Sequence, residues 1–212
     1  MSAAATLDRL SEIRIVPVVV IDDAERAPDV AAALAEGGIG CAEITLRTPQ
    51  GLEAIRSIGH LTDFIVGAGT VYTVGQVDRC VDAGAQFLVS PGFDDEVVAR
   101  AQHHDVAVLP GVATATEIQR ALRAGLATVK FFPADRLGGL DTIRALAAPF
   151  TDVRFMPSGG VNEANATEYL RHPAIFGVSG SWMVTRDAIA AGDFDDIAQL
   201  SRGASALVAD LA

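Results

Sequence analysis

One side chain stands apart from the other basic residues of this 212-residue chain. The sequence has 15 arginines but a single lysine, Lys130, inside the apolar segment TVKFF of residues 128–132. Side chains alternate between the faces of a strand, so Lys130 should share its face with Thr128 and point inward. A desolvated lysine can become a neutral amine that attacks carbonyl carbons, which arginine cannot do. Lys130 is therefore predicted to form a Schiff base; the alternative is a lysine that reaches the surface or pairs with a buried carboxylate.

A second apolar segment carries polar residues only at alternate positions. In CAEITLRT, residues 41–48, Glu43, Thr45 and Arg47 share one face, and the apolar residues share the other. Glu43 is predicted to be a general acid/base beside Lys130, because imine formation and aldol cleavage both need proton transfer. Arg47, at the strand end, is predicted to bind a carboxylate with two hydrogen bonds. The alternative is a buried ion pair of Glu43 with Arg47 or Lys130.

Two glycine-containing loops follow the last two apolar runs. The first is SGGVN, residues 158–162, and the second is GVSGS, residues 177–181. Glycines let backbone N–H groups approach an anion, and a serine hydroxyl adds a donor. Barrel enzymes often bind phosphate with the loops after strands 7 and 8. Gly159, Gly160 and Ser181 are therefore predicted to bind a phosphate group.

Eight short apolar runs position these residues, and amphipathic stretches separate them. The runs begin at residues 15, 41, 64, 86, 106, 128, 153 and 175. Alternating strands and helices predict an α/β fold with a parallel sheet covered by helices. Eight such units predict a (β/α)8 TIM barrel with a short N-terminal helix and one domain over residues 1–212, with its chemistry at the C-terminal strand ends. An open doubly wound sheet is the alternative.

Composition and charge exclude several functions. A net charge of −11 argues against nucleic acid and anionic membrane surfaces as partners. We find no signal peptide and no apolar run near the ~20 residues that span a bilayer. Two isolated cysteines are typical of the reducing cytoplasm. The four histidines lack metal-ligand spacing, so we expect them at the surface and predict no metal and no other cofactor.

The motifs, taken in order, resemble those of a known family. AEITLRT, VGAGTV, SPG, LPGVATATE, KFFPA, GGL, PSGGVN and GSW occur here as in bacterial 2-keto-3-deoxy-6-phosphogluconate (KDPG) aldolases, a family that also includes 4-hydroxy-2-oxoglutarate aldolases. The resemblance runs from residue 16 to about residue 193. It implies a metal-free class I aldolase on a small barrel, a cytoplasmic homotrimer of the Entner–Doudoroff pathway. Such enzymes cleave KDPG to pyruvate and glyceraldehyde 3-phosphate.

The resemblance also implies residue roles. Lys130 would form the Schiff base with pyruvate, and Glu43 would move protons through a water. The substrate-binding residues would be Arg47 and Thr70 for the carboxylate, Pro91 and Phe132 for the pocket wall, and Gly159, Gly160 and Ser181 for the phosphate. Two departures occur: Ser158 stands where the family often has threonine, and residues 71–74 lack the common Asn-Pro. The first is expected to affect epimer selectivity, and the second only the next helix cap.

Several alternatives remain open at this stage. The same chemistry is possible on 4-hydroxy-2-oxoglutarate or 2-keto-3-deoxy-6-phosphogalactonate, although the Ser181 hydroxyl favours a phosphorylated substrate. A metal-free phosphosugar isomerase or epimerase would use Glu43 as base and Lys130 only as a charge. A non-catalytic phosphosugar-binding barrel would leave both residues a structural role.

Overall fold

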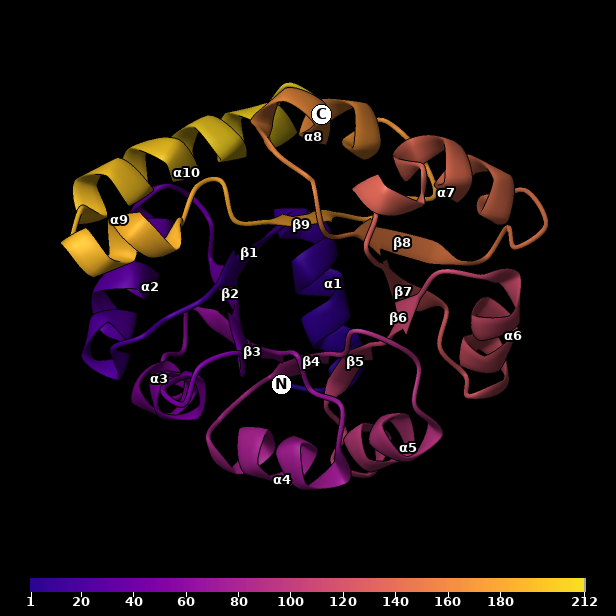
Figure 1. Cartoon of the computed structure of the whole chain (residues 1–212), viewed down its shortest axis with the longest axis horizontal. Coiled ribbons are helices and arrows are strands. Elements are labelled where there is room, and N and C mark those ends of the chain that lie inside the picture. The colour runs from indigo at the N-terminus through magenta and orange to yellow at the C-terminus, as the bar shows by residue number, and fades with distance from the viewer. Residues whose placement is uncertain (212) are drawn as a thin grey trace.

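The protein consists of parallel strands enclosed by helices, and the computed structural model describes residues 1–211 (Figure 1). Residue 212, the last of the predicted single domain, lies outside the described residues. The strands are β1 (Ile15–Val19), β2 (Cys41–Thr45), β3 (Ile65–Gly69), β4 (Phe87–Val89), β5 (Ala107–Leu109), β6 (Gly111–Val112), β7 (Thr128–Phe131), β8 (Arg154–Pro157) and β9 (Val178–Gly180).

The helices alternate with these strands along the chain. They are α1 (Ala3–Ile13), α2 (Ala27–Glu36), α3 (Gly51–Ile58), α4 (Val74–Asp82), α5 (Asp95–His103), α6 (Ala115–Arg123), α7 (Gly139–Ala147), α8 (Glu163–Leu170), α9 (Arg186–Ala191) and α10 (Phe194–Ala209), with 3-10 turns η1 (Ala24–Arg26) and η2 (Asp135–Leu137). Figure 1 shows α2 to α8 and α10 around the outside of the curled sheet. The predicted N-terminal helix and parallel α/β architecture are confirmed.

Each of the eight predicted apolar runs forms a strand, and the fifth run is divided in two. Pro110 separates β5 from β6, because proline has no N–H to donate to a ladder. One ladder has the order β5-β4-β3-β2-β1-β9, and the other has the order β6-β7-β8. The two ladders are joined by isolated parallel bridges between the β8 segment and the β9 segment. These bridges pair Phe155 with Ile175 and Ser158 with Ser179. The result is a curled parallel sheet of two ladders.

The hydrophobic core is one cluster of buried side chains from both the strands and the helices. Every residue of β1, β2 and β3 is buried, as expected for parallel strands with both faces covered. Phe87, Phe131 and Phe155 are among the largest fully buried side chains. Burying one such side chain contributes roughly 1.5–3 kcal/mol.

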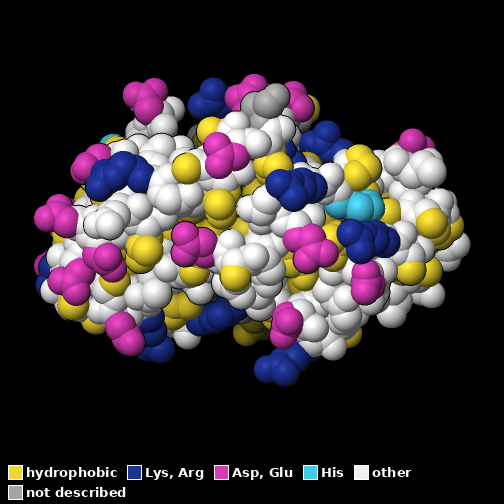
Figure 2. Space-filling model, turned by 90° about the horizontal axis from the view of Figure 1, so that it is seen from above, with side chains coloured by type: hydrophobic (Ala, Val, Ile, Leu, Met, Phe, Trp, Pro, Cys, Tyr) yellow, Lys and Arg dark blue, Asp and Glu magenta, His cyan; other side chains and the backbone are white. Residues whose placement is uncertain are grey.

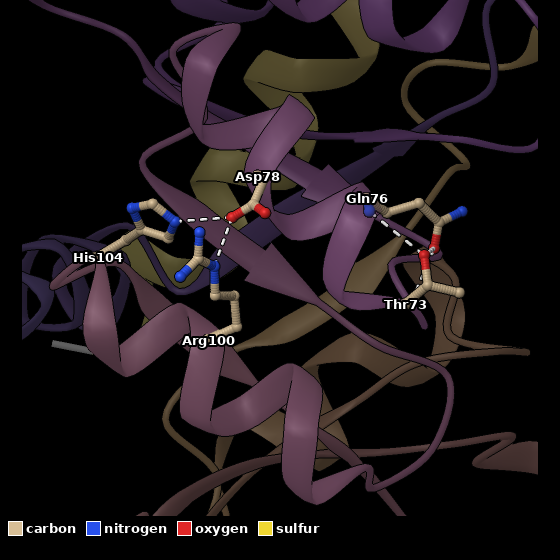
Figure 3. Close-up of polar contacts among 5 residues, drawn as sticks. All are labelled: Thr73, Gln76, Asp78, Arg100 and His104. Atoms are coloured by element: carbon tan, nitrogen blue, oxygen red, sulfur yellow. Dashed lines mark hydrogen bonds and ion pairs between the residues drawn. The ribbon is translucent and has the colours of Figure 1, made fainter.

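Helix caps fix where the loops after the strands end. Thr73 begins α4 with a capping box: its hydroxyl accepts from the Gln76 N–H at 3.2 Å, and Gln76 Oε1 accepts from the Thr73 N–H at 3.1 Å (Figure 3). Thr114 and Glu117 form the same arrangement at the start of α6. The segment after GAGT therefore has a complete helix cap without the family's Asn-Pro.

Helix α1 covers the N-terminal ends of the strands. The backbone N–H of Ala3 donates to Asp105, just before β5, at 3.4 Å. Arg154, the first residue of β8, donates to the Ser11 hydroxyl at 2.6 Å. In Figure 1, α1 crosses the area that the strands enclose. The opposite, C-terminal ends of the strands are thus the ends left for a binding site.

The surface carries charges of both signs. Figure 2 shows acidic and basic side chains interspersed over one face, with no large area of positive charge. Among residues 1–211, none of the helices combines the length and the apolar character needed to cross a bilayer.

Candidate active site

Lys130 and Glu43 meet inside the sheet. Lys130 lies on β7 and is 4% exposed, whereas Glu43 lies on β2 and is 1% exposed. The Lys130 Nζ atom is 3.7 Å from Glu43 Oε1. Charged groups are rarely buried so completely unless they are paired, because leaving water costs several kcal/mol per ion. The two residues thus form a desolvated amine–carboxylate pair.

The Lys130 amine also faces an aromatic ring. Its Nζ lies 4.9 Å from the centroid of the Phe132 ring, within the range of a cation–π contact. Its backbone is fixed as well, since the Lys130 N–H donates to the Pro110 carbonyl at 2.9 Å. The break in the strands at Pro110 therefore supports the lysine directly.

Glu43 occupies a space made by a glycine on the neighbouring strand. The register of β2 and β3 places Gly69 beside Thr45, one step beyond Glu43 on the same face. A Cβ atom at Gly69 would lie 2.1 Å from Glu43 Oε1, so no larger residue fits without moving the carboxylate. Glu43 Oε2 accepts a hydrogen bond from the Ser179 hydroxyl at 3.5 Å. Oε1 is buried and has no hydrogen-bond partner among the described residues.

Arg47 and Ser181 line one cavity at the C-terminal ends of the strands. The cavity has a volume of about 240 Å³, and its walls are Val18, Val20, Arg47, Thr48, Ser181, Val184 and Arg186. Both predicted binding residues are exposed, so their polar groups are free to meet a ligand. Arg186 is held by Asp22 through two bonds of 2.5 and 2.6 Å. This guanidinium lowers the pKa of the Asp22 carboxyl.

Thr70 and Pro91 follow the ends of two adjacent strands. Thr70 comes directly after β3 and has a φ of 62°, in the left-handed region that non-glycine residues seldom adopt. Strained backbone of this kind costs about 1–3 kcal/mol and often accompanies function. Pro91 lies exposed two residues after β4. Both residues therefore stand at the same edge of the sheet as Arg47.

The Gly159–Gly160 loop connects the sheet edge to Lys130 through Phe132. Gly159 and Gly160 have φ values of 90° and 87°, which favour glycine. A Cβ at Gly159 would lie 3.4 Å from the Phe132 ring, so the loop packs on the ring that faces Lys130. These contacts bring together four of the predicted site residues: Lys130, Glu43, Phe132 and Gly159. Arg47 and Ser181 share the cavity of about 240 Å³ at the strand ends.

Sequence reasoning missed Ser179. Ser179 is 0% exposed, and its hydroxyl donates a hydrogen bond to Glu43 Oε2. A signal was present, because Ser179 is a polar residue inside the apolar run of residues 175–180, as Lys130 is in its own run. The segment GVSGS was instead interpreted only as a phosphate loop.

The expectation of four surface histidines was partly wrong. His60 and His103 are exposed, but His104 and His172 are only partly accessible. His104 Nε2 lies 2.8 Å from Asp78 Oδ1, to which Arg100 Nε donates at 2.6 Å (Figure 3). Arg100 first, and then His104, lower the pKa of Asp78 by hydrogen bonding. This cluster joins α4 to α5 and is structural. In residues 1–211, no three His, Cys, Asp or Glu side chains converge as metal ligands would.

Comparisons with known proteins agree on one family. Residues 7–200 match the family model described as "Aldolase: KDPG and KHG aldolase". The 2-dehydro-3-deoxy-phosphogluconate aldolase of Treponema pallidum (strain Nichols) is 48% identical over 196 residues, 92% of this chain and 93% of that protein.

Solved structures are similar over nearly the whole chain. The 2-keto-3-deoxy-6-phosphogluconate aldolase of Zymomonas mobilis ZM4, with 3-phosphoglycerate, has a TM-score of 0.88 at 40% identity and 95% coverage of each chain. The KDPG aldolase of Legionella pneumophila was captured with pyruvate as a covalent carbinolamine. Its TM-score is 0.86 at 39% identity, with coverage of 89% of this chain and 92% of that one.

Proposed function

The chain belongs to the KDPG and KHG aldolase family, and on that premise we propose how it acts. It is a lyase, a class I aldolase that reversibly cleaves KDPG to pyruvate and glyceraldehyde 3-phosphate in the Entner–Doudoroff pathway. The observation that carries this proposal is the buried Lys130–Glu43 pair with its 3.7 Å separation. The covalent pyruvate carbinolamine of the Legionella pneumophila relative supports the same chemistry.

Lys130 begins the reaction as the nucleophile. Its neutral amine adds to the C2 ketone of KDPG, and the carbinolamine loses water to give an iminium ion. Phe132 and the surrounding strands shield the amine from bulk water.

Glu43 moves the protons. Glu43 removes the C4 hydroxyl proton, and the C3–C4 bond breaks. The electron pair of that bond moves into the iminium to give an enamine. Glyceraldehyde 3-phosphate leaves, C3 takes up the proton, and water hydrolyses the new iminium to release pyruvate and Lys130. The iminium is the electron sink, so the sequence of steps calls for no cofactor. A carboxylate 3.7 Å from the amine can act directly or through one water.

The remaining binding residues are proposed to hold the two ends of the substrate. Arg47 and Thr70 bind the carboxylate, and Pro91 and Phe132 form the pocket wall. Gly159, Gly160 and Ser181 bind the phosphate. The cavity that Arg47 and Ser181 share supports an anionic ligand at the strand ends. The 3-phosphoglycerate in the Zymomonas mobilis relative supports a phosphorylated one.

We infer three further properties. The two ladders close into one eight-stranded barrel, which the pairing of the first strand with the last and the bridges to β8 support. Residues 1–212 act as one domain, and three copies form a cytoplasmic homotrimer, as the family resemblance implies. Light scattering after gel filtration tests the assembly: the expected mass is three times that of the chain.

Trapping with borohydride tests the chemistry. The protein is incubated with pyruvate and borohydride, and the modified peptide is mapped by mass spectrometry. A reduced adduct on the peptide that contains Lys130 is expected. An unmodified Lys130, or an adduct only at the N-terminal amine, would remove the Schiff-base mechanism and favour a phosphosugar isomerase with Glu43 as base.

A further inference from the structure

We propose that Ser179 is a positioning residue for Glu43: its hydroxyl holds Oε2, so that Oε1 faces the Lys130 amine and the substrate. The inference rests on the proposed aldolase function and deepens it. Ser179 Oγ lies 3.5 Å from Glu43 Oε2, and Lys130 Nζ lies 3.7 Å from Oε1. The two oxygens of one carboxylate thus face different partners.

The backbone on either side of Ser179 fixes the direction of its side chain. Strand β9 pairs in parallel with β1, where Val16 is the partner of Ser179. On the other side, Ser179 forms an isolated bridge to Ser158, directly after β8. The side chain is 0% exposed and is therefore shielded from bulk water. A hydroxyl that is fixed in this way is suited to orient a carboxylate on another strand.

Glu43 needs such a donor, because burial removes it from water. A buried ionised carboxylate is costly unless hydrogen bonds replace its hydration. Oε1 accepts no hydrogen bond from the described residues. Among these residues, the Ser179 hydroxyl is therefore the donor to this carboxylate, through Oε2. At 3.5 Å the bond is longer than the usual hydroxyl–carboxylate hydrogen bond.

The Lys130 amine cannot provide the same support throughout the reaction. Once its nitrogen is bonded to C2 of the substrate, it has fewer N–H groups and a different direction. The Ser179 hydroxyl takes part in no bond-making step, so it can donate to Oε2 in every intermediate. Oε1 then takes the proton from the C4 hydroxyl and returns it, while Oε2 stays anchored. This division of roles between Oε1 and Oε2 requires a hydroxyl at position 179, and a small side chain without a hydroxyl would not be sufficient.

Three variants test the proposal. Ser179→Ala removes the hydroxyl, and Ser179→Thr retains it. Ser201→Ala is the matched control, because Ser201 is also 0% exposed, lies on α10, and its Oγ makes no hydrogen bond to a described residue. For each, kcat and KM are measured from pH 5 to pH 9, together with the thermal unfolding temperature and borohydride trapping with pyruvate.

For Ser179→Ala we expect kcat to fall about 10- to 100-fold, since a hydrogen bond to a charged group is lost. KM should change little, and the acid limb of the kcat profile should move to higher pH. The Lys130 adduct should still form. Ser179→Thr should recover most of kcat, and Ser201→Ala should match the unmodified protein in both kcat and profile.

Unchanged kcat and pH profile in Ser179→Ala, or a loss that Ser201→Ala reproduces, would overturn the proposal. If Ser179→Ala does not fold, Ser179→Cys replaces it, because a thiol fills the space but is a weak donor. The proposal then requires lower kcat in Ser179→Cys than in Ser179→Thr, and equal values would overturn it. Failure of the aldolase function would be seen separately, as the absence of an adduct on unmodified protein.

Discussion

Lys130 Nζ and Glu43 Oε1 are 3.7 Å apart, on strands that belong to different hydrogen-bonded ladders. No backbone bond joins β2 to β7 directly, so the pair spans the interior that the strands surround. The separation is longer than a direct N–H···O hydrogen bond. This arrangement makes the roles of the two residues separable by mutation.

Lys130→Arg should abolish aldolase activity, with a loss on the order of 10⁴-fold or more, as is typical when a covalent nucleophile is removed. A guanidinium keeps the charge but cannot form the imine. Aldolase turnover of KDPG, coupled to pyruvate detection, is the measurement. Arg202→Lys is the control, because it adds a second lysine on the exposed face of α10. Its activity should be unchanged and its adduct should remain on Lys130; substantial turnover by Lys130→Arg would contradict the imine mechanism.

Glu43→Gln should lower kcat by about 10²–10⁴-fold, the usual contribution of a general acid/base. The amide keeps the size of the side chain but cannot accept and return a proton. It also leaves Lys130 without a carboxylate, so thermal stability must be recorded in parallel. The expected result is a folded protein with slow cleavage. Turnover near that of the unmodified protein would show that another group moves the protons.

Gly69→Ala should impair activity through a steric effect. The added Cβ would lie 2.1 Å from Glu43 Oε1, so the carboxylate must turn away from Lys130. We expect a decrease in kcat together with destabilisation of about 1–3 kcal/mol, typical of overpacking in a core. Urea unfolding and steady-state kinetics measure the two effects.

Gly203→Ala is the matched control for that experiment. Gly203 is exposed within α10, where a Cβ would meet only Glu163 Oε1 at 3.9 Å. Replacing a helical glycine by alanine should stabilise the protein by roughly 0.5–1 kcal/mol without changing kcat. Equal kinetics in the two variants would mean that the position of Glu43 does not depend on Gly69.

The strands and the reactive pair could be predicted from the sequence, because apolar runs and isolated charges within them are local signals. Lys130 and Glu43 are conspicuous for that reason. The division of the fifth run into β5 and β6 at Pro110 was not predicted, because the run was interpreted as one strand.

The arrangement across strands could not be predicted in the same way. Ser179 contacts Glu43 across 136 positions of sequence, and Arg47 shares a cavity with Ser181 only because β2 and β9 flank β1. Such proximity depends on strand order and stagger, which local patterns do not encode. His104 was misjudged for the same reason: its partner Asp78 lies on another helix.

Asp78→Asn should reduce stability in a pH-dependent way. Arg100 and His104 lower the pKa of Asp78 below its ordinary value of 3.8, so folding favours the ionised carboxylate. The contribution of the ionised Asp78 carboxylate to folding stability is therefore fully present above pH 3.8. It is lost as the pH falls through the lowered pKa of the folded state. The Tm difference between the unmodified protein and Asp78→Asn should be largest near neutral pH and shrink in strong acid.

The control for this pH series is Asp82→Asn, an exposed carboxylate on the same helix, α4. It should give little difference in Tm at any pH, because the expected effect comes from the hydrogen bonds of Arg100 and His104 to Asp78. A constant Tm difference for Asp78→Asn across the series would contradict the ionic origin of the effect.

Ser181→Ala should separate phosphorylated from unphosphorylated substrates. The Ser181 hydroxyl lines the cavity that also contains Arg47, and it is proposed to donate to the phosphate. Losing a hydrogen bond to a charged group should raise KM for KDPG roughly 10-fold or more. KM for 4-hydroxy-2-oxoglutarate, which has no phosphate, should stay the same, and Ser57→Ala on α3 provides a serine control away from the strand ends. An equal rise for both substrates would place Ser181 at a part of the ligand that they share, and the preference for a phosphorylated substrate would then need another source.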